Sequence, residues 1–498
     1  MVRVPPRGGR RGVSARLHRL LRWVGAVSGA TAPTPINGPL PPGVLLLQLD
    51  GLSRPELEAS LAAGRMPFLA SLLREQGYRC HSVFSGLPAT TPSFQGEFFY
   101  GVRQSVPAWA FLERETGEIA QFLDSKMVAR REEHLKSLGS GLLTGGSAYA
   151  CLLGGGAAEV HFCTGKERWL NFHTQLPPLT RAALSARYLA RAPRVTLLMV
   201  LEALRALWQM VGSAPPARDQ LSFLFKRVAL DVAVRRYMRA GIGGDLVRGV
   251  PIIFGNFLDY DCHAHMGGPH SDFARQVLPG LDLTLRHLWT HARRSGRRRY
   301  QVWIFSDHGQ QSAVPFSADD EGLLARLLQP YLSAEEKLVI ADNGPLGHIY
   351  LEPRPTDERL EQLASVLVKD LGVPQVAWLR GAGGAGSEAF VLNSKGRFSL
   401  NGVPVAVVGQ HRFSADSAED LSRLTRHPEA GDLIALGWSP ERCVSYAREL
   451  GCHGGPGPEE THAFALLPED APVDPSAKTL RALDLREAAL RHLQSPPM

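Results

Sequence analysis

A short apolar segment that ends in metal-binding side chains constrains this chain more than any other feature. Val302 to Phe305 is an apolar run with β-branched and aromatic members, and it ends abruptly in Ser-Asp307-His308-Gly. The pattern predicts a buried strand whose last residues leave the sheet and present Asp307 and His308 at its carboxyl edge. Open α/β sheets carry their chemistry at this edge. Taken alone, the Asp-His pair is equally well explained as a polar turn, so its interpretation depends on the rest of the chain.

Strands and helices alternate along most of the sequence. Val44 to Leu49 reads as a second buried strand, followed directly by Asp50, and Val250 begins a third strand that is predicted to end at Asp261. Segments with helical spacing separate these strands. The sequence therefore predicts an α/β fold in which a mostly parallel sheet has helices on both faces.

Composition divides the 498 residues into predicted regions. Residues 1–42 are rich in arginine, proline and glycine and are predicted to form a disordered basic arm and linker. Residues 43–470 are predicted to form one large α/β domain, with a helical insertion at about 107–248 and a small α+β cap at about 356–445. A helical tail is predicted over residues 471–498.

Charge and hydropathy argue against several classes of protein. The net charge of +7 comes largely from arginine, much of it in the runs Arg3 to Arg22 and Arg293 to Arg299, and no basic groove with interleaved aromatic residues is present, so no nucleic-acid partner is expected. The apolar stretch from Val195 to Val211 is interrupted by Glu202 and Arg205, which disfavours a membrane-spanning helix. It is predicted to be a buried cap helix, with peripheral membrane contact as the alternative. No clear signal peptide is present, which favours a cytoplasmic location, and no feature specifies the oligomeric state.

The six cysteines contain no Cys-x-x-Cys pair, so a disulfide-rich secreted scaffold is not expected. Cys262 and Cys452 lie beside candidate metal ligands. They are predicted to be small buried hydrophobic residues, with a disulfide or a thiolate ligand as alternatives.

Four predicted segments at the sheet edge carry carboxylates or imidazoles. Three carboxylates and three imidazoles form a ligand set that suits zinc or a similar divalent ion. Six such ligands can hold two ions about 3.5–4 Å apart, the spacing of a two-metal phosphoryl-transfer site. Asp259 and His263 share the four-residue spacing of Asp261 and His265, so either pair could supply ligands. The candidate ligands are Asp50, Asp261 with His265, Asp307 with His308, and His453.

A candidate nucleophile lies in the segment Pro88-Ala-Thr90-Thr91-Pro-Ser93. This segment follows a predicted strand and precedes a predicted helix from Gln95 to Tyr100. A hydroxyl at a helix amino terminus lies beside free backbone N–H groups, which also bind phosphate. An ordinary helix cap is the alternative interpretation of the same residues.

Together these motifs resemble the type I phosphodiesterase/nucleotide pyrophosphatase family of the alkaline phosphatase superfamily, including its bacterial branch. The resemblance runs in order from about Val44 to Pro468 and excludes much of the predicted insertion. The matching pieces are Leu49-Asp50-Gly51, Pro88-Ala-Thr-Thr91 with Gly101, Tyr260-Asp261-Cys-His-Ala-His265-Met-Gly-Gly-Pro269, Ser306-Asp307-His308-Gly309 and Cys452-His453-Gly454.

The resemblance implies roles for individual residues. It implies that Asp261 and His265 are ligands, because Gly268-Pro269 follows His265 at the family's spacing, and that Asp259 and His263 lie behind them. It implies that Thr91 is the nucleophile, with Thr90 as the alternative.

The same resemblance divides the ligands between two ions. One ion is expected on Asp50, Thr91, Asp307 and His308, and the other on Asp261, His265 and His453. The chain departs from its relatives at Phe94, where they often carry an asparagine that touches phosphate, and Gln95 is the candidate substitute.

The expected activity is metal-dependent hydrolysis of a small phosphate ester, either a phosphodiester or a nucleotide pyrophosphate, through a phospho-threonine intermediate. Two divalent ions are expected as cofactors, zinc first and manganese second. The alternatives are a transferase that passes a phosphoethanolamine-type group to an acceptor, and a non-catalytic, metal-stabilised binding protein. The sequence does not name the leaving group, because cap residues set it.

Overall fold

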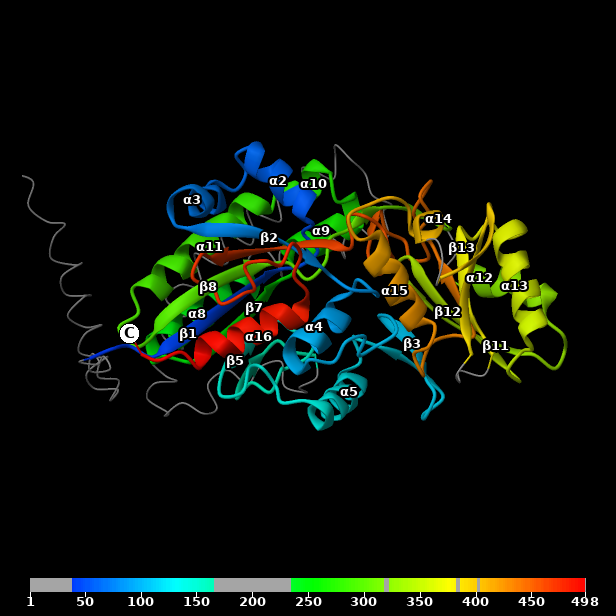
Figure 1. The fold of residues 1–498 in the computed structure, drawn as a ribbon, viewed down its shortest axis with the longest axis horizontal. Helices are drawn as coiled ribbons and strands as arrows, with labels where there is room; N and C mark the ends of the chain where they lie inside the picture. Colours follow the sequence, from blue (N-terminus) through cyan, green and yellow to red (C-terminus); the bar gives the residue numbers. More distant parts are fainter. Residues whose placement is uncertain (1–37, 165–233, 318–321, 382–385, 401–403, 498) are drawn as a thin grey trace, which may run out of the picture. The chain divides into compact units, whose positions relative to one another are not determined.

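The structure is a computed structural model that describes residues 38–164, 234–317, 322–381, 386–400 and 404–497. Among these residues, seven strands form the main sheet in the order β2-β19-β8-β1-β7-β5-β6. Figure 1 labels β1, β2, β5, β7 and β8 of this sheet. All neighbouring strands pair in parallel except β19, which is antiparallel to both β2 and β8. The predicted mostly parallel α/β sheet is therefore confirmed. The strands are β1 (Pro42–Leu49), β2 (Tyr78–Phe84), β5 (Ser147–Tyr149), β6 (Glu159–His161), β7 (Ile252–Phe257), β8 (Arg299–Phe305) and β19 (His462–Pro468).

Helices cover both faces of this sheet, as the alternation of side chains along β1 requires. Val44 and Leu46 point into an apolar cluster with α4 and α16, whereas Leu45 and Leu47 point into a second cluster with α3, α8 and α11. Every residue of β1 is buried, which accounts for its continuous apolar run. The helices are α2 (Arg54–Ala62), α3 (Pro67–Glu75), α4 (Thr91–Tyr100), α8 (Arg235–Arg248), α11 (Leu278–Arg293) and α16 (Ala482–Leu493).

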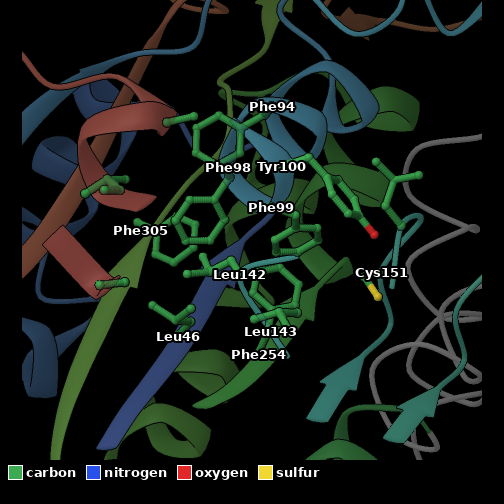
Figure 2. Packing of buried hydrophobic residues seen from close by; sticks show 14 of the residues in the cluster. Leu46, Phe94, Phe98, Phe99, Tyr100, Leu142, Leu143, Cys151, Phe254 and Phe305 are labelled. Atoms are coloured by element: carbon green, nitrogen blue, oxygen red, sulfur yellow. The ribbon is translucent and has the colours of Figure 1, made fainter. Parts of the chain in front are cut away.

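Aromatic side chains fix α4 against the sheet (Figure 2). The ring centroids of Phe98 and Phe305 lie 5.3 Å apart, and those of Phe99 and Phe254 lie 4.9 Å apart in an edge-to-face arrangement. Phe94 also packs near Phe305. Because such pairs stabilise a packing beyond the area that they bury, they hold the amino terminus of α4 in place at the sheet edge.

A second sheet has the order β11-β12-β16-β13-β14-β15 in the described part of the chain, and its pairings are antiparallel. Two of its strands, β11 and β12, precede the range 356–445 that was predicted for the cap. The predicted domain boundaries stay a prediction. Its strands are β11 (Lys337–Asn343), β12 (Leu346–Glu352), β13 (Gln375–Arg380), β14 (Glu388–Asn393), β15 (Gly396–Ser399) and β16 (Leu433–Leu436), with helices α12 (Leu323–Leu328), α13 (Asp357–Lys369), α14 (Pro404–Val408) and α15 (Ser414–Leu424) nearby in sequence.

Shorter elements complete the described chain. Three two-stranded pairs are formed by β3 with β4, β9 with β18, and β10 with β17. Residues 1–37 of the predicted basic arm lie outside the described residues. The stretch from Val195 to Val211 also lies outside them. No helix among the residues described is long and apolar enough to cross a bilayer. The elements are β3 (Ala110–Glu113), β4 (Glu118–Gln121), α5 (Ser125–Leu138), α9 (Asp259–Gly267), α10 (Asp272–Arg275), β9 (Gln311–Ser312), β10 (Val314–Pro315), η2 (Gln329–Tyr331), β17 (Val444–Ser445) and β18 (Gly451–Cys452).

Candidate metal and catalytic site

The structure places the seven predicted site residues at ends of neighbouring elements. Asp50 directly follows β1, and Asp307 and His308 come after β8, the adjacent strand, with only Ser306 between. Thr91 is the first residue of α4, and His453 directly follows β18. The remaining two, Asp261 and His265, lie on α9, which begins two residues after β7.

The predicted continuation of the third strand to Asp261 is wrong. β7 ends at Phe257, and Asp261 lies in the first turn of α9. Carboxylates are favoured in a first helical turn because they face the positive end of the helix dipole. The helix also explains the four-residue spacing, since Asp261 and His265 lie one turn apart on the same face.

The Thr91 hydroxyl joins a first group of ligand candidates. Its Oγ1 lies 3.1 Å from His308 Nε2 and donates a hydrogen bond of 3.4 Å to Asp50 Oδ1. His308 Nε2 in turn lies 3.5 Å from Asp50 Oδ1 and 3.4 Å from Asp307 Oδ2. All four residues are buried, and Asp50, Asp307 and His308 have the convergence of donor atoms that a metal site needs.

A second group forms around Asp261. Its carboxylate lies 3.3 Å from His265 Nε2 and 3.9 Å from His453 Nε2. The rings of His453 and His308 stack with centroids 3.7 Å apart. Asp261, His308 and His453 also converge closely enough to share an ion, so His308 stands where the two groups meet.

The three carboxylates create an excess of buried negative charge. Burial and the neighbouring Asp307 and Asp261 raise the pKa of Asp50 well above its usual value. Burial and Asp261 raise the pKa of Asp307 to about 7. Both carboxylate oxygens of Asp307 are buried without a hydrogen-bond partner among the described residues. A divalent cation would compensate this charge, and the oxygen and nitrogen donors present fit zinc or manganese.

The histidines respond to the same charges in opposite directions. Burial and the neighbouring His453 hold the pKa of His308 well below its usual value, so its ring is neutral and able to bind a metal. Burial alone would lower the pKa of His265, but the carboxylates of Asp261 and Glu449 outweigh it and raise that pKa. Burial opposes a low pKa at Asp261, yet His265, His453 and His308 together lower it.

Three side chains that the sequence did not single out hold the ligand candidates in place. Asn256 donates from Nδ2 to Asp50 Oδ2 over 2.6 Å, and Gln310 donates from Nε2 to Asp261 Oδ1 over 2.6 Å. Glu449 Oε2 lies 2.7 Å from His265 Nδ1. Gln310 directly follows the Ser-Asp-His-Gly motif, and this position is the only feature of the sequence that points to any of the three side chains.

The alternative candidates have other surroundings. Thr90 is the N-cap of α4, and its Oγ1 is buried without a hydrogen-bond partner among the described residues. Asp259 forms an ion pair with Arg235 at 2.8 Å, and the His263 ring packs on Phe273.

Phe94 and Gln95, the residues at the departure from the family pattern, make contacts with other parts of the chain. Phe94 belongs to the apolar core between α4 and the sheet. Gln95 Oε1 accepts hydrogen bonds of 3.0 and 3.1 Å from the backbone N–H groups of Leu152 and Leu153. The carbonyl of Gln95 is therefore committed to a neighbouring loop.

His270, which directly follows the Gly268-Pro269 motif, bridges two carboxylates. Its Nδ1 lies 3.0 Å from Glu56 Oε2, and its Nε2 lies 2.9 Å from Glu459 Oε2. Hydrogen bonds to Glu459 and Glu56 raise the pKa of His270 to about 10. The bridge joins α2, the start of α10 and the segment after His453.

We expect this bridge to make stability depend on pH on the alkaline side. Because the pKa is raised from 6.5 to about 10 on folding, the stabilisation is complete below pH 6.5 and is lost as pH rises through about 10. The ring is 42% exposed, so solvent limits the effect to about 1 kcal/mol or less. The free energy of unfolding, measured with denaturant at pH 6 and at pH 10, should change less between the two pH values in His270→Gln than in the unmodified protein. An equal change in both proteins would contradict the assignment.

Comparison with known proteins gives structural relatives only. No protein-family model matches the chain, and no curated protein matches its sequence. Similar solved structures include phosphonoacetate hydrolase from Sinorhizobium meliloti 1021 with phosphonoformate, which is 15% identical with a TM-score of 0.52, covering 91% of this chain and 96% of that chain. Its complex with phosphonoacetate is 13% identical with a TM-score of 0.51, at the same coverage of 91% and 96%.

A murine protein, ectonucleotide pyrophosphatase/phosphodiesterase 5 in complex with AMP, is 11% identical with a TM-score of 0.49, covering 92% of this chain and 96% of that chain. The likeness to phosphonoacetate hydrolase extends over nearly the whole length of both proteins. The likeness is one of fold: the chain has an alkaline-phosphatase-like α/β fold, which it shares with phosphonoacetate hydrolase.

Proposed function

We propose that the protein is a metal-dependent hydrolase that cleaves phosphate esters, with Thr91 as the nucleophile. Phosphodiesters and nucleotide pyrophosphates are the preferred substrates, because the five sequence motifs resemble those of the phosphodiesterase/nucleotide pyrophosphatase family. The structural relative from Sinorhizobium meliloti is described as a phosphonoacetate hydrolase, so phosphonates belong among the substrates to be compared.

One observation carries the proposal. The Thr91 hydroxyl lies at the amino terminus of a ten-residue helix and within 3.4 Å of both Asp50 and His308. A phosphate placed there meets free backbone N–H groups at the end of α4. It also lies beside a cluster of carboxylates and imidazoles whose excess negative charge favours divalent cations.

The chain's own residues then have defined tasks. Asp50, Asp307 and His308 would hold one ion, and Asp261, His265 and His453 the other. When bound, such ions supply positive charge that lowers the pKa of a hydroxyl and stabilises charge on phosphoryl oxygens. Asp50 Oδ1 accepts the hydrogen bond of the Thr91 hydroxyl and orients its oxygen.

The reaction proceeds in two displacements. Thr91 Oγ1 forms a bond to phosphorus while the bond from phosphorus to the leaving oxygen breaks, and the hydroxyl proton of Thr91 passes to the leaving oxygen or to solvent. A water oxygen then bonds to phosphorus, the Oγ1–P bond breaks, and the threonine hydroxyl is restored. The buried position of Thr91, which is 6% exposed, limits access of water to the nucleophile before substrate binds.

The proposal is tested with chromogenic substrates and defined metals. Protein freed of metal with a chelator and reloaded with zinc or manganese should release nitrophenol from bis-p-nitrophenyl phosphate, and the chelated protein should not. A parallel screen compares p-nitrophenyl phosphate, nucleotide pyrophosphates and phosphonoacetate. Binding of about two ions per chain without turnover of any of these compounds would refute the hydrolase and favour a binding protein.

Glu449 offers a prediction that does not depend on activity. Its carboxylate lies 2.7 Å from His265 Nδ1 and accepts a 2.7 Å hydrogen bond from Ser445. Carboxylates that orient a ligand histidine in this way raise metal affinity, so Glu449→Gln should weaken zinc binding by about 10–100-fold. Competition with a chromophoric chelator measures this affinity. Glu441→Gln, which removes a half-exposed surface partner of Lys395, should leave it unchanged, and equal affinities for both variants would contradict the role of Glu449.

A further inference from the structure

Two cysteines outside the proposed site occupy matching positions on neighbouring strands. Cys151 follows the last residue of β5 by two positions, and Cys163 follows the last residue of β6 by two positions. Tyr149 and His161 are partners in the parallel pairing of these strands. The backbone pairing continues past them, because Thr164 N donates to Cys151 O over 3.2 Å. The two cysteines therefore stand opposite each other.

The backbone before each cysteine adopts an unusual conformation. Ala150 has a φ of 53° and Phe162 a φ of 56°, in the left-handed region that residues with a Cβ rarely enter. The described residues contain only one other non-glycine residue with positive φ, Gln104. Such conformations cost free energy and persist where the surrounding structure compensates for them. Here they occur at equivalent positions, and both turn a thiol toward the other strand.

The two sulfur atoms lie 2.6 Å apart, and their residues are 2% and 3% exposed. This separation is closer to a disulfide bond of about 2.05 Å than to ordinary non-bonded contact at about 3.5–4 Å. We propose that Cys151 and Cys163 form a disulfide bond. The second cysteine pair, Cys443 and Cys452, has its sulfur atoms 3.5 Å apart and is assigned as two thiols.

The bond forms by thiol–disulfide exchange with a small disulfide such as oxidised glutathione. One cysteine thiolate attacks the glutathione disulfide and releases one glutathione thiolate, which leaves a mixed disulfide. The other cysteine then attacks the protein sulfur of that mixed disulfide and releases the second glutathione. The protein loses two thiol protons and two electrons, which one oxidised glutathione takes up as two reduced molecules. Burial raises the pKa of Cys151, so exchange is expected while the chain folds and the finished bond is protected.

The bond would act on the helix that carries the nucleophile. Cys151 lies at the margin of the aromatic cluster that packs α4 on the sheet (Figure 2). The next two residues, Leu152 and Leu153, donate their backbone N–H groups to Gln95 on α4. A covalent link between the ends of this loop would limit the motion of the loop. It would thereby help to hold α4 in place through the hydrogen bonds to Gln95.

The test is alkylation of the full-length protein. One sample of the protein is expressed in bacteria with an oxidising cytoplasm. A second sample is first reduced and then exposed to oxidised glutathione in mild denaturant. Both are denatured with N-ethylmaleimide and weighed by mass spectrometry. Four of the six cysteines should take up reagent, all six should do so after reduction, and peptide mapping should find Cys151 linked to Cys163. Amide exchange of the peptide containing Leu152 and Leu153 should quicken on reduction.

Paired variants separate this bond from the alternatives. Cys151→Ser with Cys163→Ser should give four alkylated cysteines in every condition, and its melting temperature should no longer respond to reductant. The protein with Cys443→Ser and Cys452→Ser should keep the crosslink and lose about 5 °C in melting temperature on reduction. Six alkylated cysteines in both oxidised preparations of the unmodified protein, or a crosslink between any other pair, would overturn the proposal.

Discussion

Replacing Thr91 with alanine is expected to lower the rate of bis-p-nitrophenyl phosphate hydrolysis by roughly 10⁴-fold or more. The substitution removes the oxygen that bonds to phosphorus, and no other hydroxyl among the described residues is hydrogen-bonded to both Asp50 and His308. Steady-state release of nitrophenol from zinc-loaded protein measures the loss. The variant should still bind zinc, because the carboxylate and imidazole ligands are unchanged.

Thr90→Ala is the matched control for this loss. Thr90 is the neighbouring residue, is equally buried, and its hydroxyl has no hydrogen-bond partner in the described part of the chain. Its substitution should leave the rate within a few-fold of the unmodified protein. Thr91→Ser should restore part of the activity because it returns the oxygen. Full activity in Thr91→Ala, or loss of activity in Thr90→Ala alone, would remove Thr91 from the proposed mechanism.

Replacing Asp307 with asparagine is expected to have opposite effects on the metal-free and metal-loaded protein. In metal-free protein at pH 8, Asp307 is a buried anion beside Asp50 and Asp261, so removing its charge should stabilise the fold by about 1–3 kcal/mol. In zinc-containing solution the same substitution should lose the stabilisation that bound metal gives. Thermal unfolding with chelator and with zinc measures the change in stability that Asp307→Asn causes in each condition. A change of the same sign in both conditions would contradict the charge argument.

The pH dependence of the metal-free protein follows from the same residue. The pKa of Asp307 is about 7 in the folded chain, against an ordinary value of 3.8. Between these values the folded state binds more protons than the unfolded state, so the Asp307 contribution favours folding increasingly as pH falls from about 7 to about 4. Asp307→Asn should remove this contribution. If the stability of the variant depends on pH as steeply as that of the unmodified protein, other groups cause the dependence.

Much of the candidate site was predictable because its residues sit in short motifs near strand ends. Asp50 and Asp307 each follow an apolar run, and such runs predict buried strands whether or not their partners are known. What the sequence could not predict was the set of side chains that hold these residues. Asn256 and Glu449 are single polar residues outside any motif, and only the folded chain brings them to Asp50 and His265.

The wrong prediction for the third strand has an equally local cause. The residues before Asp261 continue an apolar strand pattern, and nothing in that pattern marks the change from β7 to α9 at Asp259. The direction of the last strand was a property that the sequence did not predict. The run from Ala463 to Leu467 reads as a buried strand in either orientation, and its antiparallel pairing with β8 and β2 depends on where the chain enters the sheet.

The position of β19 has a consequence for how the protein is made. This strand, His462–Pro468, lies between β2 and β8, which are separated from it by some 380 and 160 residues of sequence. While the ribosome is still translating residue 460, β2 has no partner in the sheet and β8 has an open edge. A nascent chain in that state exposes backbone donors and acceptors that invite aggregation. Chaperones that bind unfinished chains would therefore be needed longest for β2, because β1 has both of its neighbours once β8 is made.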